Sequence, residues 1–351
     1  MSRFFSEKYK ALTPYTPGEQ PQDMQYIKLN TNESPYPPSE KAQRYAAEEI
    51  ARLQLYSDPE CTRLVEKMAS LLGVSKREII FTNGSDDVLN FAFMAFCDEK
   101  TGVAFPDITY GFYPVFAKLN NIEYEEIPLR EDYTIDVEKF CGIGKTIFIA
   151  NPNAPTGIAL PLSEIEEIVR RNPDNVVVID EAYVDFGTES AVSLIGKYSN
   201  LLVTQTFSKS RSMAGARLGF AVGCRELIAD LNTIRYSTNP YNINRMTMAA
   251  GIGVIEDEEY TRKNCRAIEE TREFTLEELS KLGFETLPSK ANFIFTKNKK
   301  ICGANLYTEL RRRGILVRYF DKARLSDFVR ITIGSREQME TLIKVIKEMN
   351  I

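Results

Sequence analysis

The chain alternates between two hydrophobic patterns. Strand-length segments that are mostly apolar lie at 78–82, 102–105, 146–150, 175–179 and 201–206, and the more polar segment at 122–129 is also predicted as a strand. Apolar residues three and four positions apart, a spacing typical of helices, occur at 39–53, 61–72, 88–97, 161–171 and 225–235. Strands that alternate with helices from about 78 to 209 predict an α/β fold with a doubly wound, mainly parallel sheet.

The pattern changes in the last quarter of the chain. A charged helical stretch at about 257–282 leads into shorter elements, namely strands at 284–287, 292–296, 315–318 and 328–333 and helices at 304–313 and 336–349. Residues 1–40 show little periodicity and many Pro and Tyr, which indicates an extended arm. We therefore predict a large α/β domain at 41–255, a smaller α+β domain at 256–351, and an arm at 1–40 that joins the small domain and contacts a second subunit.

Composition narrows the possible chemistry. The chain of 351 residues carries a net charge of −5 and offers no basic surface for nucleic acid. It shows no apolar run of about 18 residues and no charged-then-apolar leader, so we expect no membrane span and a cytoplasmic location. The chain contains no histidine, which excludes Ser-His and Cys-His catalytic pairs and histidine-based metal sites. Proton transfer must then use Lys, Asp, Glu, Tyr or Cys.

The apolar run at 201–206 leads into a polar segment that holds one lysine, Lys209, beside the hydroxyls of Thr206 and Ser208. Small residues at 213–216 keep the next turn compact, and Arg217 adds a fixed positive charge. An amine can form an imine with a carbonyl compound, while a hydroxyl and a guanidinium can hold a phosphate. The set predicts a pyridoxal phosphate site, and the alternative is a surface loop with solvated Lys and Arg.

Two more loops follow strands at positions suited to a ligand. Gly84, Ser85 and Asp86 precede a helix, where free backbone N–H groups and the helix dipole attract anions. The simpler interpretation is that Ser85 or Asp86 caps the helix. Tyr110 follows the next strand and is either a stacking partner for a flat ring or a core residue.

Polar residues also end later strands. Asp180 follows the run at 175–179, and Tyr183 lies three residues on, so a carboxylate could pair with a protonated pyridine nitrogen and a phenol could reach a ring oxygen. The alternative for Asp180 is a loop cap. Arg318 and Arg330 lie in or at the end of predicted strands, where a carboxylate or phosphate partner would explain them, although surface ion pairs are an alternative.

Asp180, Lys209 and Arg217 thus occur in this order, separated by strand signals. Further motifs are spread along almost the whole chain: LNTNESPYPPS, TNGSDD, NPNAPTG, DEAYVDF, TFSKSRSMAGARLGF, PYNINR, and GILVRYF followed by VRITIG. On these motifs the sequence resembles the pyridoxal-phosphate-dependent aminotransferases of fold type I, and within them the histidinol-phosphate aminotransferases.

The resemblance implies roles for single residues. Lys209 would form the internal aldimine with pyridoxal phosphate and then transfer the proton. Asp180 would keep the pyridine nitrogen protonated, Tyr183 would contact the ring oxygen and Tyr110 would stack on the ring. The groups implied to hold the phosphate are Gly84, Ser85, Asp86, Ser208, Arg217 and, from the other subunit of a homodimer, Tyr56.

The implied reaction is transamination of L-histidinol phosphate with 2-oxoglutarate, which gives imidazole acetol phosphate and glutamate and belongs to histidine biosynthesis. Arg330 would pair with a substrate carboxylate. Histidinol phosphate has no carboxylate, so its phosphate needs a cation. The candidates for this contact are Arg330 and Arg318, with Tyr15 and Asn32 of the arm.

One position departs from the pattern of the superfamily. An asparagine usually precedes Pro-Thr-Gly and hydrogen-bonds the ring oxygen of the cofactor, whereas this chain has Ala154 there and Asn153 one residue earlier. Asn153 remains a candidate for the contact. We predict that Tyr183 carries more of it.

Other functions fit parts of the sequence. An aromatic or broad-specificity aminotransferase would differ in its rates with histidinol phosphate and phenylalanine, and a phosphothreonine decarboxylase on the same scaffold would release carbon dioxide. A cofactor-sensing regulator would need a DNA-binding module, for which residues 1–40 are too few and too rich in proline.

Overall fold

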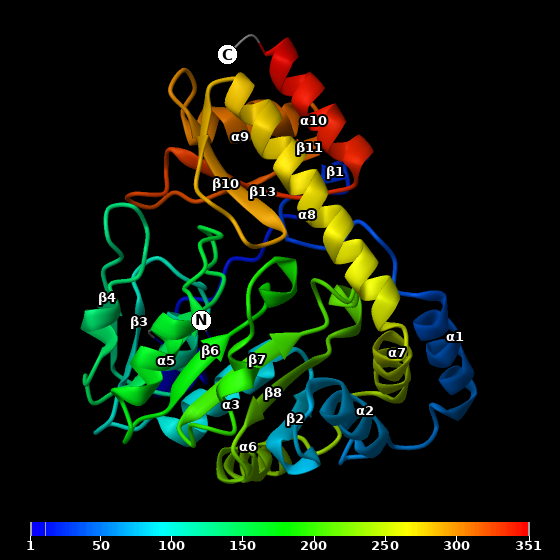
Figure 1. Cartoon of the computed structure of the whole chain (residues 1–351), viewed down its shortest axis with the longest axis vertical. Coiled ribbons are helices and arrows are strands. Elements are labelled where there is room, and N and C mark those ends of the chain that lie inside the picture. The colour runs from blue at the N-terminus through cyan, green and yellow to red at the C-terminus, as the bar shows by residue number, and fades with distance from the viewer. Residues whose placement is uncertain (1, 11, 350–351) are drawn as a thin grey trace.

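A seven-stranded sheet forms the centre of the larger part of the protein in the computed structural model, which describes residues 2–10 and 12–349 (Figure 1). The strand order is β2-β8-β7-β6-β5-β3-β4. β8 runs antiparallel to both of its neighbours, and the other paired strands are parallel. The strands are β2 (Ile79–Thr82), β3 (Val103–Pro106), β4 (Tyr124–Ile127), β5 (Thr146–Ala150), β6 (Val177–Asp180), β7 (Leu201–Thr206) and β8 (Gly219–Gly223).

Helices cover both faces of this sheet. Successive residues of β6 point to opposite faces, so Val177 and Ile179 join one hydrophobic core and Val178 joins the other. Both faces of a parallel sheet must be covered, which explains why β6 is apolar without alternation. The first core also takes residues from α1 (Glu40–Glu49), α2 (Thr62–Leu72), α5 (Leu162–Arg170) and α7 (Arg245–Ile255), and the second from α3 (Ser85–Phe96), α4 (Tyr113–Leu119) and α6 (Arg225–Thr238).

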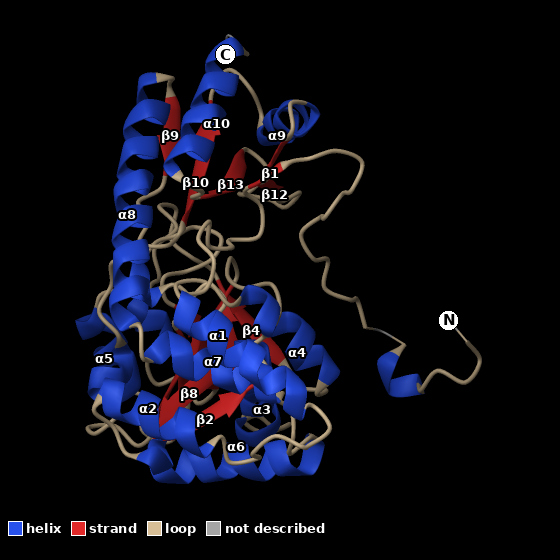
Figure 2. Ribbon diagram, turned by 90° about the vertical axis from the view of Figure 1, so that its right-hand side faces the viewer, coloured by secondary structure: helices blue, strands red, loops and turns tan. Residues whose placement is uncertain are grey.

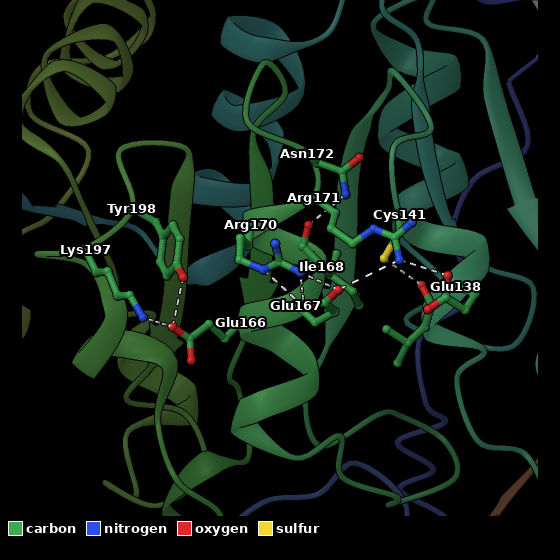
Figure 3. A network of polar contacts seen from close by, with 11 residues as sticks. Glu138, Cys141, Glu166, Glu167, Ile168, Arg170, Arg171, Asn172, Lys197 and Tyr198 are labelled. Atoms are coloured by element: carbon green, nitrogen blue, oxygen red, sulfur yellow. Dashed lines mark hydrogen bonds and ion pairs between the residues drawn. The ribbon is translucent and has the colours of Figure 1, made fainter.

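Helix α5 shows how a covering helix is held. Its inner face buries Ile168 in the first core. Figure 3 shows the polar side, where Glu166 is paired with Lys197, and Arg171, just after the helix, reaches Glu138 at 2.9 Å. Exposed ion pairs contribute at most about 1 kcal/mol each, whereas burial of one isoleucine contributes about 2 kcal/mol. Core packing therefore decides where α5 lies.

A second, smaller sheet lies above the first in Figure 1, with its strands in the order β12-β13-β10-β9 and all pairs antiparallel. The arm joins it through a parallel pair of β1 (Ile27–Lys28) and β11 (Ile315–Leu316), and Figure 2 shows the first residues running away from the body. The remaining elements are β9 (Phe284–Thr286), β10 (Phe293–Asn298), β12 (Arg318–Tyr319), β13 (Phe328–Thr332), α8 (Glu258–Lys281), α9 (Gly303–Arg312) and α10 (Arg336–Glu348).

Several elements differ from the sequence prediction. The single strand predicted at 315–318 is wrong, because β11 and β12 are separated at Val317 and belong to different sheets. The capping role considered for Ser85 and Asp86 is also wrong: α3 already begins at Ser85, and Gly84 is its N-cap, with no side-chain capping bond. The pattern analysis did not predict β8, α4 or α7. In the described ranges, no helix combines the length and the apolar character that a membrane span needs.

Candidate active site

A cavity of about 460 Å³ opens at the carboxyl ends of β6 and β7. Open parallel sheets bind ligands at this edge. The structure brings together here nine of the side chains predicted from the sequence: Ser85, Asp86, Tyr110, Asp180, Tyr183, Thr206, Ser208, Lys209 and Arg217.

Lys209 lies in the loop that connects β7 to β8. Its Nζ donates a hydrogen bond to the backbone oxygen of Thr31 at 3.1 Å, which connects the arm to the cavity. Burial lowers the pKa of the Lys209 amine to about 8, and the positive charge of Arg330 adds to this effect. The neutral amine, which a nucleophile or a base requires, is therefore reached at a lower pH than for an exposed lysine.

Asp180 is the last residue of β6 and is 4% exposed. Its Oδ2 accepts a hydrogen bond from the hydroxyl of Tyr113 at 3.1 Å, whereas its Oδ1 is buried without a partner among the described residues. Burial raises the pKa of the Asp180 carboxyl to about 7, and the bond from Tyr113 opposes this rise. An unpartnered buried carboxylate oxygen is costly, which indicates that a donor from a ligand belongs here.

The part of the cavity at the start of α3 is suited to an anion. The first N–H groups of α3 have no acceptor within the helix and carry its positive dipole end. Arg217 reaches this turn, and its Nη2 lies 2.9 Å from Oδ2 of Asp86. A Cβ at Gly84 would lie 2.6 Å from Nη2 of Arg217, and one at Gly219 would lie 2.2 Å from the Ser85 nitrogen, so both glycines are needed for this close packing.

Polar groups continue around this end. The hydroxyl of Tyr110 donates to Oδ1 of Asp86 at 2.8 Å, which fixes the tyrosine ring at the wall of the cavity. The Thr206 hydroxyl donates to the Ser208 Oγ at 3.0 Å, and the Ser208 backbone N–H returns a bond to Thr206. An amine, a buried carboxylate and an anion site thus lie in one cavity.

The sequence matches, over residues 24–346, the family described as Aminotransferase class I and II. The chain belongs to this family. It is 48% identical over 349 residues to a histidinol-phosphate aminotransferase of Brachyspira hyodysenteriae and 47% identical over 349 residues to one of Clostridium acetobutylicum, and each comparison covers 99% of both chains.

Solved structures of aminotransferases share the fold. The histidinol-phosphate aminotransferase from Clostridium acetobutylicum aligns with a TM-score of 0.84 at 24% identity, covering 92% of this chain and 98% of that chain. The enzyme from Sinorhizobium meliloti, solved in complex with pyridoxal-5'-phosphate, aligns with a TM-score of 0.84 at 22% identity, covering 93% and 92%. The predicted fold class and enzyme class are confirmed: the chain is a pyridoxal-phosphate-dependent aminotransferase of fold type I.

Ala154 stands where the superfamily usually has an asparagine, and in this aminotransferase it lies in a different environment from its neighbour Asn153. Ala154 lines the cavity, but Asn153 does not. The Asn153 amide nitrogen donates to the Ile108 carbonyl oxygen at 2.9 Å and to the Thr156 hydroxyl at 3.1 Å, and its oxygen accepts from Thr109 at 2.9 Å. The side-chain amide of Asn153 is thus hydrogen-bonded to other residues of the protein and not directed at the cavity.

The predicted substrate residues lie beside the cavity, outside its lining. Arg330 is mostly buried, donates from Nη2 to the Asn30 oxygen at 3.1 Å, and has an Nε that is buried without a partner in the part of the chain that the structure describes. Arg318 donates to the backbone oxygens of Thr16 and Pro17 at 2.9 and 3.1 Å, so it holds the arm in place. Tyr15 stacks on Phe112 with ring centroids 4.2 Å apart.

The two remaining predicted residues, Asn32 and Tyr56, lie in different environments. Asn32 of the arm donates a hydrogen bond to the hydroxyl of Tyr183 at 2.9 Å. Tyr56 does not line the cavity of its own chain, is 80% exposed and stacks on Tyr241 with centroids 4.6 Å apart.

The sequence analysis did not single out four residues that bring polar side chains to the site. Gln20, Thr31 and Glu33 bring the arm to the cavity wall, and Tyr113 binds Asp180 from outside it. The polar segment LNTNES next to the arm's strand was a signal for Thr31 and Glu33. Tyr113 gave no such signal, because aromatic residues after a strand usually belong to the core.

Proposed function

We propose that this enzyme transfers the amino group between L-histidinol phosphate and 2-oxoglutarate, with glutamate and imidazole acetol phosphate as the other pair. The observation that carries the proposal is one cavity lined by Lys209, Asp180 and Arg217. The identity of 47 to 48% over nearly whole chains supports the choice of substrate.

The residues present fit pyridoxal phosphate. The unpartnered Oδ1 of Asp180 suits a pyridine N–H, the anion site at α3 and Arg217 suits the phosphate, and the partly neutral amine of Lys209 suits the aldehyde. When bound, the cofactor supplies an aldehyde that takes up the amino group and a ring that accepts electrons from the substrate Cα.

The protein's own groups then divide the work. With the cofactor bound, Lys209 Nζ would be the base that takes up and returns the proton of the substrate Cα, since the chain has no histidine for this role. The free Oδ1 of Asp180 would hold a proton on the pyridine nitrogen of the bound cofactor, because a buried carboxylate stabilises the charged form of that nitrogen. Tyr183 would donate a hydrogen bond from its hydroxyl to the ring oxygen, because the side chain of Ala154 has no donor.

The substrate phosphate needs fixed positive charge near the cavity. Arg330 and Arg318 supply it, and Tyr15 and Asn32 complete the set from the arm. The unpartnered Nε of Arg330 supports this role, because it leaves one buried donor to be satisfied. A carboxylate of glutamate fits the same guanidinium in the second half of the reaction.

The enzyme acts as a homodimer in this proposal. Exposed apolar side chains gather next to Tyr56, at Ile50, Leu53 and Leu55, each more than half exposed. A second copy of the chain that covers them would receive Tyr56 at its phosphate site. The cytoplasmic location and the domain limits at 40/41 and 255/256 remain predictions of the sequence.

The test is spectroscopic and kinetic. Purified enzyme loaded with pyridoxal phosphate should lose its visible absorbance on addition of histidinol phosphate and regain it with 2-oxoglutarate. The value of kcat/KM for histidinol phosphate should exceed that for phenylalanine. A higher value for phenylalanine would contradict the assigned substrate, and release of carbon dioxide would contradict the reaction.

A further inference from the structure

We propose that Tyr113 is a positioning residue for Asp180. Its hydroxyl occupies Oδ2, so Oδ1 is left as the acceptor for the ring nitrogen of the cofactor. The inference rests on the proposed function, in which Oδ1 of Asp180 accepts the N–H of the pyridine ring.

The fold fixes Tyr113 before any ligand arrives. Tyr113 is the first residue of α4, and its side chain is fully buried. Its ring packs against Phe105 and Phe148 with centroid distances of 5.7 Å, and edge-on against Tyr110 at 5.6 Å. The ring is thus packed on several sides, with its hydroxyl directed at Asp180.

Two tyrosines that lie three residues apart thus each donate a hydrogen bond to a carboxylate. Tyr110 donates to Asp86 at the anion end, and Tyr113 donates to Asp180 at the ring end. Asp86 has a second partner in Arg217, but Asp180 has no cation within hydrogen-bonding distance among the residues that the structure describes. The Tyr113 hydroxyl is therefore the strongest restraint on the basicity of Asp180, and the backbone N–H of Ala182 and the charge of Lys209 make smaller contributions.

This restraint decides where the shared proton lies. A hydrogen bond to a carboxylate stabilises its charged form and makes it a weaker base. Without the Tyr113 hydroxyl, Asp180 would be more basic and would draw the proton from the pyridine nitrogen, which would make the ring a poorer electron acceptor. The other titratable groups that act on Asp180 are Asp86, Lys209, Tyr110 and Tyr183.

The variant Tyr113→Phe removes the hydroxyl and keeps the ring. The matched control is Tyr124→Phe, because Tyr124 stacks on the same Phe105 at 5.4 Å and does not line the cavity. Equal melting temperatures of the two variants show that packing is preserved.

The first readout needs no cofactor. In apoprotein with ¹³C-labelled aspartate carboxyls, Asp180→Asn identifies the Asp180 signal, which should titrate near pH 7 in the wild type. Tyr113→Phe should raise this midpoint by about 1 pH unit or more, and Tyr124→Phe should leave it unchanged. An unchanged midpoint in Tyr113→Phe overturns the proposal.

The second readout uses the loaded enzyme. The ¹⁵N resonance of labelled pyridoxal phosphate should move toward unprotonated pyridine in Tyr113→Phe, and kcat should fall about tenfold with a smaller change in KM. A resonance equal to that of the wild type overturns the proposal, whereas failure of the wild type to bind the cofactor overturns the proposed function alone.

If Tyr113→Phe does not fold, a measurement on the wild-type apoprotein still tests the hydrogen bond between Tyr113 and Asp180. The ¹³Cζ signal of Tyr113 must then follow the titration of Asp180 near pH 7, and a signal that does not respond contradicts the hydrogen bond.

Discussion

The side-chain amide of Asn32 donates a hydrogen bond to the hydroxyl of Tyr183 across 2.9 Å, which joins the arm to the loop after β6. The oxygen of the same amide accepts a bond from Thr332 of β13 at 3.0 Å. The arm, the loop after β6 and strand β13 thus meet at Asn32, and Tyr183 and Ala154 line the same cavity.

The variant Tyr183→Phe should change the absorbance titration of the bound cofactor. A hydroxyl donor stabilises the ionised ring oxygen, so its removal should move the midpoint to higher pH by about 1–2 units. The measurement is the visible spectrum between pH 5 and 10. A titration that coincides with that of the wild type would refute the role of Tyr183.

Removal of the Asn32 amide should give a smaller shift in the same direction. Asn32 has a φ of 58°, which glycine adopts without strain, so Asn32→Gly deletes the side chain and spares the backbone. We expect a shift of about 0.5 unit, because the Tyr183 hydroxyl remains. A shift to lower pH would contradict this arrangement.

The variant Gly84→Ala should weaken cofactor binding, because its Cβ would lie 2.6 Å from Nη2 of Arg217. Gly73→Ala is the control: its φ of +69° is also positive, but no atom lies within 4 Å of a Cβ there. Both variants should lose about 1 kcal/mol of stability, whereas the Kd for pyridoxal phosphate should rise about tenfold in Gly84→Ala alone. Equal Kd values for the two variants would contradict the anion site.

The variant Asp180→Asn should stabilise the apoprotein while it abolishes activity. Burial raises the pKa of Asp180 to about 7, so the native state binds a proton more tightly than the unfolded chain. The ionised group therefore costs stability that grows from pH 4 and is complete above pH 7, on the order of 4 kcal/mol.

Denaturant unfolding of the apoproteins at pH 4, 6 and 8 measures this difference. The gain in the free energy of unfolding for Asp180→Asn should be largest at pH 8 and close to zero at pH 4. A gain that does not depend on pH would show that Asp180 titrates normally.

The place of Tyr56 can be tested by complementation. Lys209→Ala and Tyr56→Ala are each expected to be poorly active alone. A heterodimer of the two contains one site with an intact Lys209 from one chain and an intact Tyr56 from the other, so mixing and reassembly should restore activity. Lys209→Ala mixed with Asp180→Asn is the control and should restore none, because both residues line one cavity of a single chain. No recovery in the Tyr56 mixture would contradict the shared site.

Periodicity predicted most elements because the central strands are buried on both faces and read as continuous apolar runs. The exception is β8, where glycines at both ends, Gly219 and Gly223, made the segment resemble a turn. Its pairing with β2 and β7 supplies the order that the local sequence does not show. Helix α4 was missed for a related reason, since its aromatic residues carry little helical preference.

Some residues of the candidate site could be predicted from the sequence, and others could not. Lys209 and Asp180 could be predicted because residues that end parallel strands meet at one edge of the sheet. The direction of the Asn153 side chain and the contact of Tyr113 with Asp180 could not, because both depend on packing between segments that are distant in sequence. The spacing of residues along the sequence does not determine the direction of these two side chains.

Covalent mapping of the cofactor is the direct test of the central claim. Borohydride reduction of the cofactor-saturated enzyme, followed by proteolysis and mass spectrometry, should find pyridoxyl phosphate on the peptide that contains Lys209, and Lys209→Ala should lack the modification. Saturated wild-type protein in which Lys209 stays unmodified after reduction would contradict the account.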